Sequence, residues 1–308
     1  MATIAQRRPA PSPLRRQETR AGLVFILPWL IGLLVFTAYP TIATFYLSLT
    51  DYNIVQPPRW TGLDNYRTMF FEDPAFWTAV RNSAVYSLVS VPLKLVVAFG
   101  LALLLNMAVR GIGLYRTIFY LPALVPPVAA TIVFILLFSS QGGPISAVLG
   151  GLGLRAPDWF NDPTWSKPAL ILLGIWPLGV ETLAFLAGLK EVPQDLLDAS
   201  AVDGAGGWQK LRHVVLPLIS PVILFNLVIG VIYSFQVFTQ ALIIGGQNGE
   251  PLQSTLMFVV LIYRNAFRYF SMGYAAALSV VLFVAVLLLT LLIFKTSRSW
   301  VHYEGGLR

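Results

Sequence analysis

The chain has 308 residues, of which 56% are hydrophobic and 11% charged, and its mean hydropathy is +0.72. Soluble domains carry about 25% charged residues, so this chain lacks the charge to cover a water-exposed surface, and lipid is the expected solvent. The absence of cysteine excludes disulfides, thiolate metal sites and cysteine nucleophiles. The net charge of +7 does not indicate a nucleic-acid partner, because the basic residues flank apolar runs and form no single patch.

The N-terminal segment is basic and rich in proline. Residues 1–20 are therefore expected to form a disordered tail. The uncharged run at 21–50 follows it. A secretory signal has an apolar core of about 7–15 residues and a small-residue cleavage site. This run is longer and no such site ends it, so it is predicted to be a retained first span.

Six apolar runs reach the length of about 20 residues that a membrane-crossing helix needs. They lie at 21–50, 82–109, 117–154, 168–189, 214–249 and 269–294. Lys94 in the second run and Glu181 in the fourth are their only charged residues. The fold predicted is an all-α integral membrane protein: a six-span domain at 21–295 between tails at 1–20 and 296–308.

The distribution of basic residues predicts the orientation of the spans. Of the 21 lysines and arginines, thirteen fall on the side that carries both termini and seven on the other. Cytoplasmic segments are enriched in these residues, so both termini are predicted to be cytoplasmic, as is the loop between spans four and five. The opposite loops, at 51–81 and 141–167, carry tryptophans that suit a membrane boundary: Trp60, Trp77, Trp159 and Trp165.

The fourth span contains an interrupted motif, GIWPLGVETLAF. Trp176, Pro177 and Gly179 predict a distorted helix, and transporter sites favour interrupted helices. Glu181 is an intramembrane acid and thus a candidate functional residue, which either binds a substrate hydroxyl or pairs with a companion subunit. Lys94 is expected to snorkel along its stem toward the interface.

A polar stretch, DASAVDGAGGWQKLRHVVLP at 198–217, separates spans four and five. Pro193 suits the first turn of a helix, which glycines from Gly204 onward would end. A second short helix is predicted to begin near Trp208, with Trp208, Leu211 and Val215 on one apolar stripe. This helix–turn–helix is either a docking element or a solvated connector.

The stretch resembles the EAA loop of ATP-binding-cassette importer permeases. That pattern is Glu-Ala-Ala, three residues, Gly, nine residues, Ile, one residue, Leu-Pro. Here the matching positions, with Asp203 beside the glycine, are Asp198, Ala199, Ser200, Gly204, Val214, Leu216 and Pro217. Every spacing matches; Asp, Ser and Val replace Glu, Ala and Ile. The segments GLYRTIFYLPALVPPVAATIVF (113–134) and YSFQVF (233–238) are similar to the carbohydrate-importer branch.

The resemblance covers nearly the whole chain and implies a maltose-permease-like subunit of an ATP-driven sugar importer in the prokaryotic plasma (inner) membrane. It implies that the EAA loop is a coupling helix seated in a cleft of an ATPase. The implied partners are a second homologous permease, forming a heterodimer, two cytoplasmic ATPase subunits, an extracytoplasmic sugar-binding protein and membrane lipid, with no nucleic acid.

Four polar residues mark the fifth span. Asn226, Tyr233 and Gln240 recur every seven residues, and Gln236 is expected on the same helical face. Amides and a phenol suit sugar hydroxyls and the flat face of a pyranose, so these residues, with Trp176 and Glu181, are candidates for the substrate path. The alternative is hydrogen-bonding glue between helices.

No energy source is visible in the chain. A phosphate-binding P-loop needs a Gly-Lys pair, and none of the lysines follows a glycine. His213 and His302 are far apart, so no metal motif is predicted. The chain is thus expected to be no enzyme and to hold no cofactor, with ATP and Mg bound by the partner ATPase. The alternatives are a glycerol-phosphate or polyol importer, an ion-coupled carrier using Glu181 and Lys94, and a channel or scaffold. Lys94 is the only cation in the spans, which favours a neutral sugar.

Overall fold

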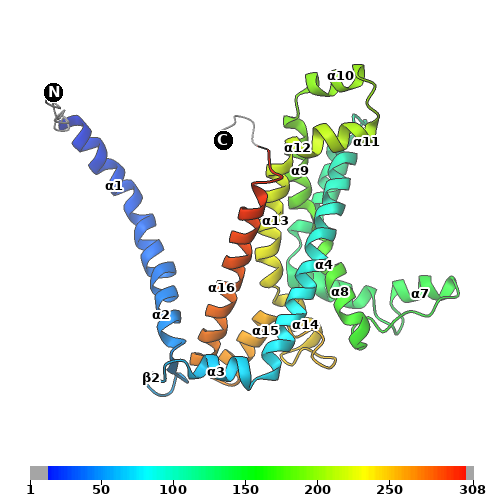
Figure 1. Cartoon of the computed structure of the whole chain (residues 1–308). Helices are drawn as coiled ribbons and strands as arrows, with labels where there is room; N and C mark the ends of the chain where they lie inside the picture. The colour runs from blue at the N-terminus through cyan, green and yellow to red at the C-terminus, as the bar shows by residue number, and fades with distance from the viewer. Residues whose placement is uncertain (1–12, 303–308) are drawn as a thin grey trace.

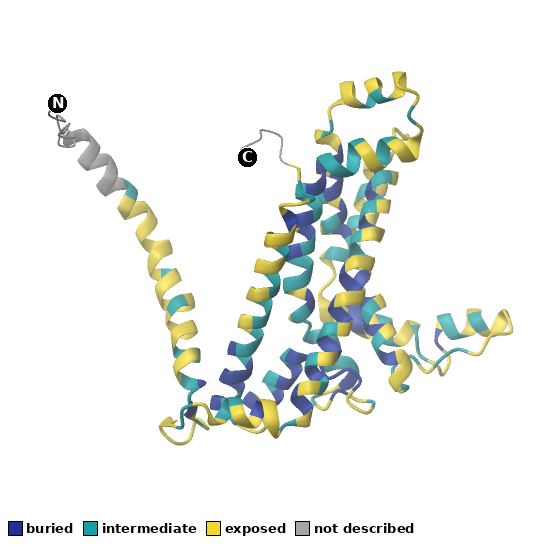
Figure 2. Ribbon diagram, in the orientation of Figure 1, coloured by how far each residue is buried: buried dark blue, intermediate teal, exposed yellow. Residues whose placement is uncertain are grey.

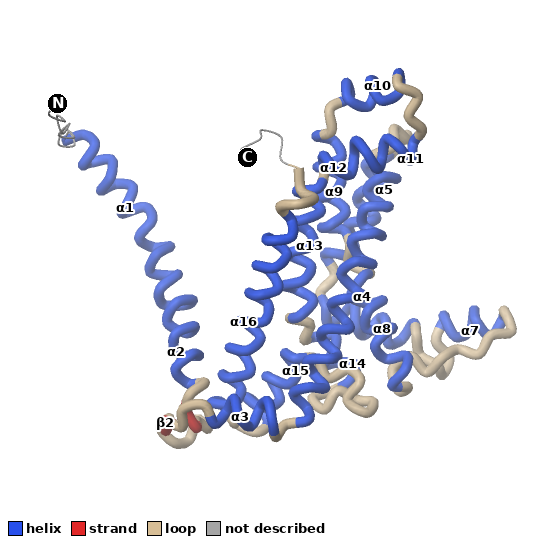
Figure 3. The backbone as a smooth tube through the Cα atoms, in the orientation of Figure 1, coloured by secondary structure: helices blue, strands red, loops and turns tan. Residues whose placement is uncertain are grey.

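The computed structural model describes residues 13–302 and is helical along almost its whole length (Figure 1; Figure 3). The first helices are α1 (Pro13–Leu33), α2 (Tyr39–Leu47), α3 (Asp64–Phe71) and α4 (Pro74–Leu105). Next come α5 (Ile112–Tyr120), α6 (Pro127–Leu137), α7 (Pro144–Gly151), α8 (Pro163–Ile175) and α9 (Gly179–Glu191). The last are α10 (Gln194–Val202), α11 (Gly207–Lys210), α12 (Leu216–Leu218), α13 (Ser220–Phe235), α14 (Thr239–Gly245), α15 (Phe258–Tyr263) and α16 (Met272–Ser297). π-Helical turns lie at Leu34–Ala38, Leu211–Val215 and Arg264–Arg268, and a 3₁₀ turn at Leu121–Leu124.

The six predicted spans are present. Within residues 13–302, four stretches without a sharp bend are long and apolar enough to cross a membrane: Gly22–Leu47, Pro74–Leu105, Ser220–Gly245 and Met272–Ser297. Two helix pairs reach that length together: Ile112–Leu124 with Pro127–Leu137, bent by 98°, and Pro163–Ile175 with Gly179–Glu191, bent by 49°. With each bent pair counted as one span the total is six, which agrees with the predicted fold class.

The sharp bend in the third span was not predicted. The chain leaves the helix at Val125, whose ψ is 127°, and Pro127 begins α6. A residue before proline is driven out of the α region by the proline ring, so the Pro126–Pro127 pair forces the break. The bend predicted in the fourth span is confirmed, at Trp176–Leu178 between α8 and α9.

The N-terminal tail is shorter than expected. The backbone is already helical from Pro13, so the disorder predicted for residues 1–20 is wrong at 13–20, and residues 1–12 lie outside the described residues. Arginine, glutamine and glutamate are good helix formers, and a helix that extends an existing span needs no new nucleus.

Two apolar clusters form the core, and α4 contributes to both. At one end Phe76 packs with Leu256 and Leu278; at the other Ala98 and Ala102, both fully buried, pack against α9. Small residues let membrane helices approach closely. In Figure 2 the buried residues follow these central helices, while the first span is exposed along most of its length.

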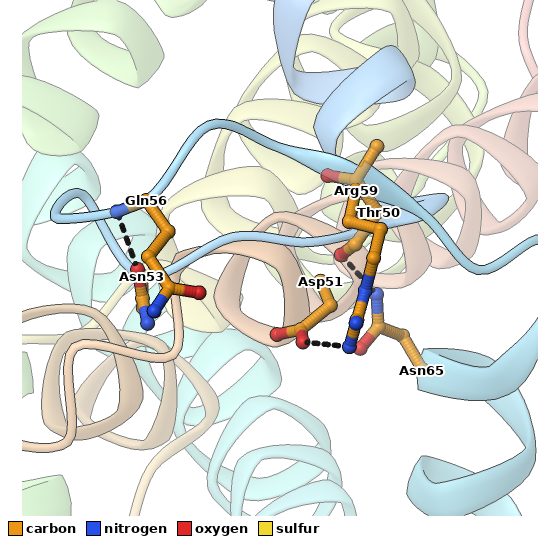
Figure 4. Close-up of polar contacts among 6 residues, drawn as sticks. All are labelled: Thr50, Asp51, Asn53, Gln56, Arg59 and Asn65. Carbon is orange, nitrogen blue, oxygen red and sulfur yellow. Dashed lines mark hydrogen bonds and ion pairs between the residues drawn. The ribbon is translucent and has the colours of Figure 1, made fainter.

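The end of the bundle opposite α10, here called the far end, is braced by polar contacts. Strands β1 (Thr50–Asp51) and β2 (Arg59–Trp60) form a small hairpin (Figure 4). Asn65 of α3 donates from Nδ2 to the carbonyls of Ser48 and Thr50, both at 2.9 Å, and so ties the hairpin to the first span. The Arg59–Asp51 ion pair of 3.3 Å is exposed and contributes little.

The loop at 246–257 is anchored to two other spans at the same end. Asn82 of α4 donates from Nδ2 to the carbonyls of Gln253 (2.7 Å) and Leu256 (3.1 Å). Ser166 of α8 shares a 2.7 Å hydrogen bond with Ser254. These bonds hold spans two and four at fixed positions around the loop.

Candidate functional site

The predicted helix–turn–helix is present between α9 and α13, and the predicted segment 190–217 is called the coupling loop below. Its turn at Gly204 has φ +77°, a conformation open to glycine and costly for other residues. The Gly204 amide donates to the Ala201 carbonyl (3.1 Å) and the Ala205 amide to the Ser200 carbonyl (2.9 Å). This pair of bonds is the Schellman motif that ends helices, so the predicted glycine stop is confirmed.

The coupling loop projects from the bundle (Figure 1), and no residue of α10 is buried. Asp198 accepts a 3.0 Å hydrogen bond from Gln194 through Oδ1, and Ser200 donates to the Leu197 carbonyl at 2.7 Å. Ala199, Asp203 and Gly204 are exposed, whereas Leu216 and Pro217 are half-buried where the chain re-enters the bundle.

Exposed apolar side chains accompany these acids. Val202 is 89% exposed and Trp208 is 69% exposed. Leu211 and Val215 are half-buried, unlike Trp208, so the three residues do not form the single apolar stripe that was predicted. The helical spacing changes between them, because a π-helical turn begins at Leu211. Apolar groups rimmed by charge on a projecting loop are typical of a protein contact.

A second candidate site is a cavity of about 320 Å³ formed by α4, α9, α13 and the start of α14. It is called the polar cavity. Its lining includes most of the predicted path residues: Glu181, Asn226, Tyr233, Gln236 and Gln240. Trp176 is not among its lining residues; its ring packs edge-on against Phe134 at 5.6 Å. Cavities of roughly 300–1,000 Å³ hold small-molecule ligands.

The path residues reach the cavity by a different route from the one predicted. The heptad spacing assumed one continuous helix, but α13 ends at Phe235 and α14 begins at Thr239. In the segment between these two helices, Gln236 and Phe238 have non-helical backbone angles. Gln236 and Gln240 therefore line the cavity because the fifth span unwinds there, and no glycine or proline in YSFQVFTQ signals that break.

An ion pair crosses the cavity wall. Lys94 Nζ of α4 lies 2.7 Å from Glu181 Oε1 of α9, and the two side chains are 23% and 18% exposed. The predicted snorkelling of Lys94 is wrong, because the ammonium is paired inside the bundle. Glu181 has its partner within this chain, a possibility the sequence did not suggest since α4 and α9 are distant in it.

The cavity also contains polar atoms without protein partners. Among the described residues, Glu181 Oε2 and Asn226 Nδ2 are buried and form no hydrogen bond. Ser234 instead donates to Ser87 of α4 at 2.6 Å. The hydrogen bond between helices thus comes from serines, whereas a carboxylate oxygen and an amide nitrogen of two cavity-lining residues have no hydrogen-bond partner in the described chain.

Comparisons with known proteins agree with these features. Residues 94–298, more than half of the chain, match the family described as "Binding-protein-dependent transport system inner membrane component". The "Probable ABC transporter permease protein YesP" of Bacillus subtilis is 42% identical over 94% of both chains. The "Arabinooligosaccharides transport system permease protein AraP" of the same organism is 30% identical and covers 95% of this chain and 96% of its own. The "sn-glycerol-3-phosphate transport system permease protein UgpA" of Escherichia coli is 32% identical over 91% of this chain and 95% of its own.

A solved structure has the same fold. It is titled "Crystal structure of a bacterial ABC transporter involved in the import of the acidic polysaccharide alginate", and one of its chains matches with a TM-score of 0.80 and 25% identity, covering 94% of this chain and 99% of that one. The spans, the coupling loop and these matches lead to one conclusion. The chain belongs to the binding-protein-dependent inner-membrane component family and is a permease subunit of a carbohydrate ABC importer.

Proposed function

We propose that this permease carries a neutral sugar through the polar cavity. The observation that carries the proposal is the set of buried polar atoms with no protein partner: an acceptor on Glu181 and a donor on Asn226. A sugar hydroxyl both donates and accepts, so it can satisfy either. Tyr233, 67% exposed at the cavity, offers an aromatic face to a pyranose ring.

Charge favours a neutral substrate over a phosphorylated one. Among the described residues, Lys94 is the only basic one that lines the polar cavity, and Glu181 already neutralises it. An anionic substrate that took Lys94 would leave the Glu181 carboxylate without its counter-ion in a low-dielectric site. The names of the relatives include both sugar permeases and a glycerol-phosphate permease, so they do not decide between a neutral and a phosphorylated substrate. The choice of a neutral sugar rests on the paired charges of Lys94 and Glu181.

The proposed partners follow from exposed surfaces. Tyr233 and the first span are exposed along a membrane-crossing bundle, and a second permease would cover the open side of the cavity. The coupling loop, with Trp208 and Val202 beside its acids, offers the contact for an ATPase that binds ATP and Mg. An extracytoplasmic binding protein would deliver the sugar at the far end.

The proposed orientation places the coupling loop and both termini in the cytoplasm. The backbone amide of His302 donates to Ser220 at 2.9 Å, which puts the C-terminal segment beside the start of α13, next to the loop. Reporter fusions after residue 306 and within residues 141–165 should report opposite sides of the membrane. The same side for both contradicts the orientation.

Uptake into proteoliposomes tests the substrate class. The complete importer is offered glucose, maltose, galacturonate and glycerol 3-phosphate, each with its binding protein loaded. We expect uptake of the neutral sugars, and a Gln236→Leu variant that loses about ten- to a hundredfold of it per assembled complex, because a hydroxyl loses its partner. Preferential uptake of either acid, or reduced assembly with normal transport per complex, contradicts the proposal.

A further inference from the structure

Three aromatic rings lead from the polar cavity to the surface at the far end. Phe238 lines the cavity in the unwound part of the fifth span. The Tyr263 ring, at the end of α15, lies 5.1 Å from it, and the Phe267 ring lies a further 5.1 Å away. Phe238 and Tyr263 are half-buried, whereas Phe267 is 60% exposed. The rings form one continuous aromatic surface from the cavity outward, called the aromatic ladder.

The backbone that presents this ladder is irregular. Phe267 stands in the π-helical turn Arg264–Arg268, a geometry that occurs frequently at functional sites. The rings are tilted by 56° and 37° to one another, and the exposure of Phe267 leaves the outer part of this aromatic surface open to a ligand. A core that needed these rings for packing alone would bury Phe267, as it buries Val260 and Leu261 of α15.

The outer ring lies next to an exposed charged residue. Arg268, the next residue, donates from Nη1 to Asn248 Oδ1 at 3.1 Å, and both side chains are exposed. The guanidinium of Arg268 also lies 5.9 Å from the Tyr269 ring centre. Charged side chains are not left facing lipid tails, so this part of the surface is aqueous.

We propose that the aromatic ladder is an outer sugar subsite, which takes a pyranose ring before the ring enters the polar cavity. The C–H groups of a pyranose carry partial positive charge and match the negative face of an aromatic ring. Arg268 and Asn248 supply donors and an acceptor for its hydroxyls. Because Phe238 belongs to both the ladder and the cavity, a sugar can move between them without losing aromatic contact. This inference rests on the proposed function.

The test uses the complete importer in proteoliposomes and the sugar that the wild-type complex takes up fastest. Phe267→Leu removes the ring and keeps an apolar side chain, and Phe267→Trp keeps a ring. We expect Phe267→Leu to lower kcat/KM for uptake about two- to tenfold through a raised KM, and Phe267→Trp to stay within about twofold of wild type. Recovery of the second permease and the thermal stability of the complex should be unchanged in both.

Two results would overturn the subsite. Normal kcat/KM in Phe267→Leu shows that the ring is not used. Reduced recovery of the second permease in that variant, with normal transport per complex, shows that a protein covers Phe267. Gln236→Leu, measured in parallel, separates this inference from the proposed function. If Gln236→Leu loses uptake while Phe267→Leu transports normally, the polar cavity is supported as the sugar path and only the aromatic ladder is rejected as a subsite.

Discussion

The coupling loop is held together by contacts between residues close in sequence, whereas the polar cavity is held together by contacts between residues far apart in sequence. In the loop, the side chains and amides bond to residues at most five positions away, as Ala205 does to Ser200. In the cavity, Lys94 pairs with Glu181, and Ser234 bonds to Ser87, 147 residues earlier. The loop can therefore keep its shape while it moves as a unit, whereas the cavity depends on how the spans are packed. Changes in the loop should affect coupling. In the cavity, changes to the contacts between spans should affect stability, whereas a change at Gln236 should affect transport.

The largest effect is expected from breaking the ion pair. Glu181→Ala leaves the Lys94 ammonium buried and unpaired, which should destabilise the complex by about 3 kcal/mol. Replacing both residues, with Lys94→Met and Glu181→Met, should restore most of this stability because no lone charge is left. Thermal unfolding of the purified complex gives the comparison.

Uptake by the same two variants sharpens the assignment of Glu181. The double variant should assemble but transport poorly, because its carboxylate Oε2 is gone. Wild-type uptake by a stable double variant would reduce Glu181 to a packing role.

Gly204→Leu should give the next largest effect, on coupling and not on assembly. A non-glycine residue in the left-handed region costs about 1–2 kcal/mol, which would unwind the turn between α10 and α11. A Cβ at this position meets no atom of the chain within 4 Å, so the bundle itself has no reason to change. The measurements are ATPase pull-down and uptake.

Gly204→Asn is the matched control, since asparagine adopts this conformation more readily. If Gly204→Asn couples almost normally and Gly204→Leu does not, the defect comes from backbone strain or from the size of the leucine side chain in the proposed ATPase cleft. Normal association and uptake in the Leu variant would remove the coupling role.

Ser234→Ala should have a smaller effect, on stability alone. It removes the 2.6 Å hydrogen bond to Ser87, and bonds between membrane helices contribute on average about 0.6 kcal/mol. Transport per assembled complex should stay normal, in contrast with Gln236→Leu. A transport defect at unchanged stability would place Ser234 on the path instead.

Asp198→Ala should have the smallest effect. Asp198 is exposed and makes one hydrogen bond within α10, and exposed charges contribute at most about 1 kcal/mol. Asp198→Glu restores the longer acid of the EAA pattern and should couple at least as well as the natural residue. ATPase stimulation by loaded binding protein measures both; a severe loss in the alanine variant would mean that this acid is desolvated at the interface.

The features predicted from the sequence are the ones encoded locally. Apolar runs and their flanking charges mark the spans, and the spacing from Asp198 to Pro217 marks the coupling loop. The bend before Pro127 had a local signal too, the Pro126–Pro127 pair, which was missed. The Lys94–Glu181 pair and the unwound segment at Gln236 have no such signal, because each depends on which spans pack together. Five of the six predicted path residues line the cavity, and Trp176 does not. The single helical face used to group the residues of the fifth span ends with α13, before Gln236 and Gln240.

The isolation of the first span bears on how the protein is made. None of the most apolar window of Gly22–Leu47 is buried, and the contacts that join this span to the bundle, such as Phe45 with Phe283, lie near its far end. Of the six spans in the described residues, this one is synthesised first, and it needs none of the later spans to be stable in lipid. Its insertion can thus fix the direction of every following span before the core has formed. If the proposed second permease packs on this helix, a subunit made without that partner would keep the helix exposed to lipid.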